Sequence, residues 1–365
     1  MRFSVNKSLL LKHLFYVQGV IDTRSTMLIL SHVLFLVKDG RLFLSSTDLE
    51  STSYTSLPIN AEEDGAVCLP AKKILEITEK ITDEDVKIST NKTNQLEVVH
   101  TTGTTKIKTL PAEDFPQIPK PEDFTYVATK SATLSSLIQK TAYAVGGDNL
   151  RKNLTGVFFD MTTPGKIRLV ATDGHRMSIA EEELENNTQE SFVLSKKAAN
   201  ELKKFIKDTE IVQIGIGKSF FVCDNGQTSI LSRLIDVDFP EYNQVLPRDL
   251  SNTFKVERKK LLESLQRVSV VLSDKARGAR MLINKNEIEI RSTSDEGETT
   301  ETIQISEAQN NTEAGFNVKY LIEALSSFEE EEVFFCVTDE VSPACIYSNK
   351  DNTHKQLSVV MPMRV

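Results

Sequence analysis

The stretch Ala171-Thr172-Asp173-Gly174-His175-Arg176-Met177 decides how the rest of the chain is read. It follows the alternating run 166–170, which is typical of a strand with one buried face. Asp173-Gly174 then predicts a tight turn, because glycine tolerates positive φ and aspartate can accept hydrogen bonds from nearby backbone. A histidine and an arginine therefore stand at a strand tip, either as a catalytic pair or as part of a rigid corner.

Related phrases occur about one domain length before and after this corner. Thr47 closes a similar run 125 residues before Thr172, and Asp295 closes another 122 residues after Asp173. Three sets of apolar residues at steps of 4, 3 and 4 each predict an amphipathic helix. The sets are Leu10, Leu14, Val17 and Ile21; Leu134, Ile138, Thr141 and Val145; and Leu261, Leu265, Val268 and Leu272. A second helix is predicted in each of the segments 67–77, 192–202 and 316–325.

The repeat predicts an α+β chain built from three tandem copies of one domain, each with two helices packed on antiparallel sheets. A period near 124 residues is too long for a solenoid and indicates whole domains. Pro- and Asp-bearing stretches at 119–124 and 247–251 predict the boundaries. We expect domains at 1–122, 123–250 and 251–365.

Composition narrows the class of protein further. The chain has 365 residues, 39% apolar and 26% charged, and no apolar run of the roughly 20 residues that a membrane helix needs. The start of the chain does not resemble a signal peptide, and four cysteines without CxxC spacing fit reduced thiols. We therefore expect a cytoplasmic protein without membrane contact. The five histidines are scattered, so we expect neither a metal nor another cofactor.

Three similar domains in one chain indicate assembly through their sheet edges. Two such chains joined head to tail would close a ring and remove the exposed edges. The candidate edges are Lys106-Ile107-Lys108 and Val270-Val271-Leu272, so Ile107, Val271 and Leu272 are the expected dimer interface.

The polar faces of the predicted helices carry many basic residues, although the formal net charge is −9. A solvated helix face is the ordinary explanation for any one helix. If all the helices faced one side, a basic wall could hold duplex DNA through its phosphates without reading sequence. The candidate DNA-binding residues are Arg24, Lys72, Lys73, Lys196, Lys197 and Arg277.

The chain resembles, over its whole length, the bacterial sliding-clamp family, the beta subunits of DNA polymerase III. The most specific pieces are residues 171–176, Asp238-Phe239-Pro240-Glu241-Tyr242 and the C-terminal run 359–365. The resemblance implies a head-to-tail homodimeric ring around duplex DNA, which acts as a processivity factor and is not an enzyme. It also implies a cleft between the second and third domains for short peptides of the polymerase III alpha subunit, the clamp loader, other polymerases and repair proteins.

Carried over position by position, the resemblance implies a peptide-binding cleft made by one set of residues. They are Arg151, Leu154, Thr172, Gly174, His175, Arg176, Met177, Pro240, Val245, Asn317, Tyr320, Val341, Pro343, Val359, Val360, Met361, Pro362, Met363 and Arg364. Asn153, Gln244 and Pro343 depart from the family's usual residue types, which leaves the peptide preference open.

Three alternatives remain at this point. Asp173 and His175 could be an acid and a base, but their side chains need not meet across the turn, and no nucleophile phrase lies nearby. An adaptor could use the same cleft without DNA, but it would not need basic helices in all three copies. Met361 and Met363 could simply belong to the last strand, although Pro362 cannot donate to a central ladder.

Overall fold

The computed structural model describes residues 1–91, 95–119, 123–147, 151–185, 188–247, 249–272, 277–349 and 355–364. The chain forms two compact units, Met1–Ser135 with Lys197–Leu234, and Ser136–Lys196 with Ile235–Val365. None of the helices in these described ranges is both long and apolar enough to cross a membrane. Both predicted boundary stretches contain residues outside the described ranges, namely 120–122 and 248.

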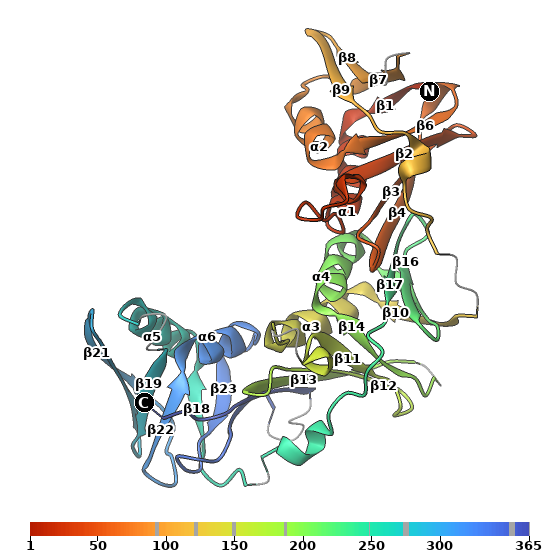
Figure 1. Ribbon diagram of the computed structural model, residues 1–365. Coiled ribbons are helices and arrows are strands. Elements are labelled where there is room, and N and C mark those ends of the chain that lie inside the picture. Colours follow the sequence, from red (N-terminus) through yellow and green to blue (C-terminus); the bar gives the residue numbers. More distant parts are fainter. Residues whose placement is uncertain are drawn as a thin grey trace. The chain divides into compact units, whose positions relative to one another are not determined.

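The first unit contains two antiparallel sheets (Figure 1). The five-stranded sheet has the order β5 (Asn60–Glu63), β1 (Arg2–Asn6), β7 (Asp85–Thr90), β8 (Gln95–His100) and β9 (Gly103–Lys108). The eight-stranded sheet has the order β10 (Thr125–Lys130), β15 (Ile211–Ile216), β16 (Phe220–Asp224), β17 (Thr228–Arg233), β4 (Ser51–Pro58), β3 (Arg41–Thr47), β2 (His32–Lys38) and β6 (Gly65–Pro70).

Helices cover these sheets because one stripe of each helix is apolar. The helices are α1 (Lys7–Gln18), α2 (Ala71–Lys80) and α4 (Lys196–Phe205), with short 3-10 turns at Leu28–Ser31, Ala112–Asp114 and Ile206–Asp208. Leu10, Leu14 and Val17 of α1 are buried, as the periodicity predicts, and Ile21 follows the end of the helix. Asn6 caps α1 by accepting a hydrogen bond from the Leu9 backbone N–H at 3.1 Å.

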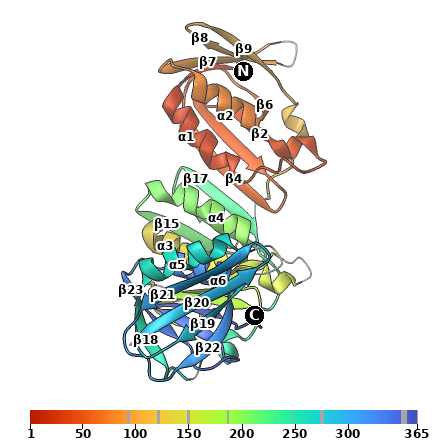
Figure 2. The same ribbon diagram turned by 90° about the vertical axis from the view of Figure 1, so that its left-hand side faces the viewer.

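The second unit also contains two antiparallel sheets (Figure 2). One has the order β14 (Ser191–Ser195), β11 (Gly156–Asp160), β12 (Lys166–Thr172), β13 (Arg176–Glu183), β25 (Gln356–Val360), β24 (Ala344–Tyr347), β23 (Glu332–Cys336) and β18 (Thr253–Glu257). The other has the order β21 (Gly297–Gln304), β20 (Glu287–Ser294), β19 (Gly278–Ile283) and β22 (Thr312–Asn317).

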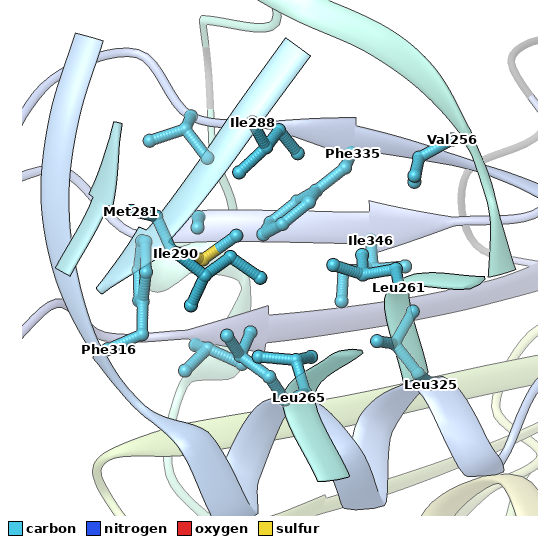
Figure 3. Close-up of a cluster of buried hydrophobic side chains, with 14 of the residues drawn as sticks. Val256, Leu261, Leu265, Met281, Ile288, Ile290, Phe316, Leu325, Phe335 and Ile346 are labelled. Atoms are coloured by element: carbon cyan, nitrogen blue, oxygen red, sulfur yellow. The ribbon is translucent and has the colours of Figure 1, made fainter. Parts of the chain in front are cut away.

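Helices α5 (Arg258–Val270) and α6 (Val318–Ser326) close the core of this unit. Figure 3 shows Leu261 and Leu265 of α5 and Leu325 of α6 pointing toward strand side chains such as Phe335 and Ile290. The remaining helical elements are α3 (Ser131–Thr141), which the division between the units crosses, and 3-10 turns at Ala142–Ala144, Lys152–Leu154 and Tyr242–Val245. All six predicted helices are thus present.

Each unit joins strands that belong to different copies of the repeat. In the first unit β17 pairs with β4, from Thr228 opposite Thr55 to Ser232 opposite Ser51. In the second unit β13 pairs with β25, from Arg176 opposite Val360 to Ala180 opposite Gln356. Neighbouring copies therefore share continuous sheets.

The expected sheet edge at Val270-Val271-Leu272 is wrong. Val270 is the last residue of α5, Val271 is its C-cap, and Leu272 follows at the helix end. A short apolar run is compatible with a strand, but the 4-3-4 spacing that ends at Leu272 belongs to a helix. The four-stranded sheet of this copy has β21 as the edge strand next to β20. Ile107, by contrast, does lie in β9, the last strand of its sheet.

Candidate functional site

The corner at 172–176 is held rigidly by its own backbone and side chains. Asp173 Oδ1 accepts hydrogen bonds from the backbone N–H groups of His175 at 2.9 Å and Arg176 at 3.0 Å. The Thr172 hydroxyl donates to the Arg176 carbonyl at 2.6 Å and accepts from the Gly174 N–H at 3.1 Å. Gly174 has φ +87°, where a side chain would be strained. The corner is therefore pre-organised, and the Asp173 carboxylate is engaged in the hydrogen bonds that stabilise it.

The first copy of the repeat builds the same corner with different residues. Asp48 Oδ1 accepts from the backbone of Glu50 at 3.0 Å and of Ser51 at 2.6 Å. Thr47 donates to the Ser51 carbonyl at 2.9 Å and accepts from the Leu49 N–H at 3.1 Å. The similarity of the two phrases in the sequence thus reflects one shared turn, not two catalytic sites.

Arg176 ties this corner to the neighbouring helices. Its guanidinium donates to Asp173 Oδ2 and to the Tyr143 carbonyl, each at 3.0 Å, and it pairs with Glu323 of α6. It also lies 4.4 Å from the ring centre of Tyr320. Burial lowers its pKa, but the hydrogen bond and charge of Glu323, together with Asp173, outweigh burial and raise the pKa above its usual value. Arg176 is therefore a permanent cation that fixes the corner against α6.

The C-terminal segment completes the site on the other side of β13. Val359 and Val360 are buried in β25, and the Met361 backbone N–H then donates to the His175 carbonyl at 2.9 Å. Beyond the strand, the Met363 N–H donates to the Gly315 carbonyl of β22 at 2.8 Å. The chain end is thus fixed as an extended segment whose Met361 and Met363 side chains are 37% and 39% exposed. The last strand stops at Val360, and Pro362 lies outside it.

A cavity of about 450 Å³ lies beside the corner and the C-terminal segment. Its floor is apolar and buried, with Leu154, Met177 and Val359 each less than 10% exposed. Val245 and Met361 expose apolar atoms at the rim. Its lining residues are Arg151, Asn153, Leu154, Thr172, Gly174, Arg176, Met177, Pro240, Glu241, Tyr242, Val245, Val359 and Met361. An apolar hollow with a few polar groups is typical of a ligand site.

The segment Asp238–Tyr242 forms one wall of the cavity, and its two aromatic side chains, Phe239 and Tyr242, anchor it to the sheet. Phe239 stacks on Phe158 of β11 at 4.8 Å between ring centres. The Tyr242 hydroxyl accepts from Arg168 at 3.1 Å and donates to Asp160 at 3.4 Å. Burial raises the Tyr242 pKa, so the phenol keeps its proton. These contacts place Pro240 and Tyr242 against the cavity.

A second hollow of about 560 Å³ lies around the end of the C-terminal segment. It is more polar, because Arg280 and Glu313 form an ion pair of 2.8 Å at its wall. Val341, Pro362, Met363 and Arg364 also line it.

The structure gathers most of the predicted cleft residues but not all. Ten line the first cavity and four line the second. His175 is exposed outside both linings, Val360 is core, and Asn317 caps α6 by accepting from the Lys319 N–H at 3.1 Å. Tyr320 lies under Arg176, and Pro343 is half-buried outside both linings. Arg176 lines the first cavity as predicted, but its side chain is only 9% exposed because it pairs with Asp173 and Glu323.

Three lining residues were absent from the predicted cleft: Asn153, Glu241 and Tyr242. Tyr242 could have been found, because it stands two residues after Pro240 in the phrase already singled out. Asn153 lies in the 3-10 turn just before Leu154, and the resemblance marks it as a position that departs from the family's usual residue type and bears on the peptide preference.

The predicted DNA-binding residues have different environments. Lys72 and Lys73 are exposed on α2, and Arg24 and Arg277 are exposed in loops. The Lys197 ammonium donates to the Val20 carbonyl at 2.8 Å and pairs with Asp48 at 2.5 Å. Lys196 is half-buried, and burial together with the charge of Arg176 lowers its pKa. Ala276, the residue before Arg277, lies outside the described residues. In the described part of the chain, no group of three or more His, Cys, Asp or Glu could hold a metal ion.

Comparison with known proteins identifies the family. Models of the DNA polymerase III beta subunit match its N-terminal domain at residues 1–119, its central domain at 128–241 and its C-terminal domain at 243–364. The beta sliding clamp of Haemophilus influenzae is 30% identical over 373 residues and that of Pseudomonas aeruginosa 29% over 375, with all of each chain covered.

Solved structures agree. The DNA polymerase III beta subunit of Thermotoga maritima superposes with a TM-score of 0.92 at 27% identity, covering 100% of this chain and 99% of that one. A Pseudomonas aeruginosa sliding clamp bound to griselimycin superposes with a TM-score of 0.92 at 29% identity, covering all of both chains. The three-copy α+β architecture is thus that of known clamps, and the chain belongs to the bacterial DNA polymerase III beta subunit family, the beta sliding clamps.

Proposed function

We propose that the chain is a processivity factor: a ring of two copies that encircles duplex DNA and tethers the replicative polymerase through the cavity beside Gly174 and Met361. The full-length match to beta sliding clamps carries the processivity function. As in that family, the chain is a non-catalytic subunit, and duplex DNA and a DNA polymerase are its partners. We further propose that the chain forms a homodimer. Its peptide-bearing partners in this proposal are the polymerase III alpha subunit, the clamp loader, other polymerases and repair proteins.

The apolar cleft supports peptide binding. A partner that buries one leucine or phenylalanine there would gain roughly 1.5–3 kcal/mol for each side chain. Two such anchors supply about 3–6 kcal/mol before the cost of ordering the peptide, whereas a micromolar dissociation constant corresponds to about 8 kcal/mol, so further contacts of the peptide must supply the rest. Met361 is flexible and polarizable, so it can adapt to several partner side chains. One cleft can therefore serve partners that compete for it.

Unpaired sheet edges support the dimer. In the described sheets, β9 and β21 each end a row of strands and leave one side of their backbone without a strand partner. Pairing of β9 from one chain with β21 from another would satisfy both edges, and two such contacts close a ring. Ile107 of β9 stays in the proposed interface. Val271 and Leu272 enter it only as the apolar end of α5 and not as a strand.

Exposed lysines on α2 support contact with DNA. Lys72 is 75% exposed and reaches Glu76 only at 3.9 Å, so its ammonium can exchange that weak pair for a phosphate. Lys197 and Lys196 already have protein acceptors and would have to release them first. We therefore rank Lys72 above Lys196 and Lys197 as a phosphate contact, and Lys73, Arg24 and Arg277 stay candidates.

The test uses the topology of a ring. The purified chain is assembled on a nicked circular plasmid with a clamp loader, washed at high salt, and the plasmid is then linearised. A ring stays on the circle, because salt cannot release a topological link, and slides off the linear form. Release from circular DNA at the salt concentration that frees it from linear DNA would rule out the ring.

The cleft is tested by removing the wall that the C-terminal segment supplies. Deleting residues 361–365 should abolish binding of a labelled peptide that carries a glutamine and a Leu-Phe pair. Light scattering should still report a dimer, because β9 and β21 are untouched. Equal peptide affinity of the native and shortened chains would place the partner site elsewhere.

A further inference from the structure

Two of the four cysteines lie directly opposite each other behind the cleft. Cys336 ends β23, and Cys345 is its cross-strand partner in β24. Both are reduced and buried, with 2% and 1% exposure. Opposite residues in antiparallel strands project from the same face with Cα atoms about 4.5–5.5 Å apart. A disulfide spans Cα separations of about 4.4–6.8 Å, so these two sulfurs can be joined without refolding.

The two thiols also differ in acidity, so that one is the nucleophile and the other its reaction partner. The hydrogen bond from Cys345 lowers the pKa of Cys336 to about 6, while the same contact and burial raise the pKa of Cys345. Burial instead raises the pKa of Cys68 to about 12 and also raises that of Cys223. Cys68 faces Leu34, and Cys223 faces Ile214 and Ile230, so neither has a second thiol opposite.

A single cross-strand row connects the thiols to the cleft floor. Cys345 is opposite Val359, Val359 is opposite Met177, and Met177 is opposite Thr172. Residues that are opposite in register share one face of the sheet. Val359, Met177 and Thr172 all line the cavity of about 450 Å³. Both cysteines also belong to the apolar cluster that contains Met177, Val359 and Tyr242.

We propose that Cys336 and Cys345 are a redox-sensitive dithiol that closes to a disulfide on reaction with hydrogen peroxide and thereby changes the floor of the peptide cleft. The Cys336 thiolate attacks a peroxide oxygen, the O–O bond breaks, and the departing hydroxide takes up a proton to leave as water. The Cys345 sulfur then attacks the Cys336 sulfenic acid, the S–S bond forms, the S–O bond breaks, and a second water leaves. The two thiols supply the two electrons that reduce the peroxide.

Closure must move the strands. Opposite Cβ atoms are about 4.5–5.5 Å apart, whereas a disulfide holds them at about 3.8 Å. Drawing β23 and β24 together displaces the next member of the row, Val359 of β25. Because Val359 lies in the floor, we expect the oxidised form to bind the peptide about five-fold more weakly, at the low end of typical coupling between sites. This effect on affinity rests on the proposed function, whereas disulfide formation does not.

The first experiment maps the thiols. The full chain is treated with hydrogen peroxide, denatured, alkylated and digested without reductant. We expect a cross-linked pair of Cys336 and Cys345 peptides that has lost two hydrogen atoms, with Cys68 and Cys223 still alkylated. Sulfoxide at Met361, which is 37% exposed, reports that the oxidant dose was sufficient. If Met361 is oxidised while Cys336 and Cys345 stay alkylated, the dithiol proposal is overturned.

The second experiment measures affinity for the Leu-Phe peptide before oxidation, after oxidation and after dithiothreitol. Dithiothreitol reduces a disulfide or a sulfenic acid but leaves methionine sulfoxide, so a reversible effect belongs to the thiols, and the Cys345→Ala variant separates the sulfenic acid from the disulfide. The matched control is Cys345→Ala, which keeps Cys336 but cannot close, with Cys336→Ser as a second variant. A reversible loss in the native chain and none in either variant supports the link to the cleft; an identical response in all three overturns it. Failure of the reduced native chain to bind peptide would instead refute the proposed function, and the thiol map would still decide the dithiol.

Discussion

Replacing Arg176 with methionine should destabilise the second unit strongly. Methionine keeps the packing of the side-chain stem on Tyr320 but removes the charge and all the hydrogen bonds of the guanidinium. Asp173 Oδ2, Glu323 and the Tyr143 carbonyl then lose a donor together.

The magnitude follows from the burial of the partners. Removing one member of a buried ion pair costs about 3–5 kcal/mol, because the other member stays buried and charged. Asp173 is 14% exposed, but Glu323 is 32% exposed and can regain water in part, so we take the lower end of that range. The expected loss is about 3 kcal/mol, which corresponds to a fall in Tm of roughly 6–12 °C.

Differential scanning calorimetry of the native and variant chains measures this loss. The matched control is Arg280→Met in the same unit, because the Arg280–Glu313 pair is about half exposed at both ends and should be worth less than about 1 kcal/mol. A double variant with Glu323→Gln should recover part of the Arg176→Met loss, since it removes the unpaired carboxylate. If Arg176→Met costs no more than Arg280→Met, Arg176 is not the anchor of the corner.

Three further outcomes are expected. The double variant Lys72→Gln with Lys73→Gln should weaken binding to all DNA sequences alike, and the slope of log affinity against log salt concentration should become shallower by about 0.9 per lost phosphate contact. Lys285→Gln, on an exposed turn, should change neither the affinity nor the slope. DNA titrations at several salt concentrations check both expectations. His13 is 3% exposed, and burial, with the charges of Lys12 and Arg41, lowers its pKa from 6.5 to about 4. Because only the unfolded chain takes up this proton between those values, stability should fall as pH drops from 6.5 to 4, by about 3 kcal/mol in all, and His13→Gln should flatten that part of the curve in denaturant titrations. Gly174→Ala should lower the free energy of unfolding by about 1–2 kcal/mol, because alanine is strained at positive φ, and it should weaken peptide binding. Gly103→Ala, at a glycine with ordinary φ, should do neither. A Gly174→Ala chain of native stability and affinity would show that the corner does not need glycine.

The periodic features of the sequence predicted the fold well, because they depend on local spacing. Stripes such as Leu10, Leu14 and Val17 are buried, and the Asp-Gly phrase forms the expected corner. Val270–Leu272 failed because a short apolar run does not distinguish a strand from the end of a helix.

The cleft was less predictable, because its polar contacts join residues far apart in the chain. Arg176 meets Glu323 across 147 positions, and Arg168 meets Tyr242 across 74. No spacing rule reports such pairs. The sequence therefore placed Arg176 in the cleft but could not show that Asp173 and Glu323 hold its side chain in a largely buried ion pair. Tyr242 stands in the phrase that contains Pro240, but its contacts with Phe158 and Arg168 arise only in the folded sheet.

The repeat also explains why a binding cleft forms where β13 meets β25. The corners at Asp48 and Asp173 make the same backbone hydrogen bonds, so the turn itself does not distinguish the two junctions. At the β4–β17 junction hydroxyls face each other, with Thr55 to Thr228 at 2.7 Å and Ser51 to Ser232 at 3.0 Å, and they satisfy one another. At the β13–β25 junction the row through Met177 and Val359 is apolar, and the chain continues past the strand with a methionine exposed on each side of Pro362. Apolar surface that the fold leaves uncovered can be covered by a partner, so a peptide that binds there also bridges the two strands and stabilises their pairing, by an amount that grows with the logarithm of its affinity. The second copy's corner and the third copy's last strand thus form one site, and neither copy alone contains it.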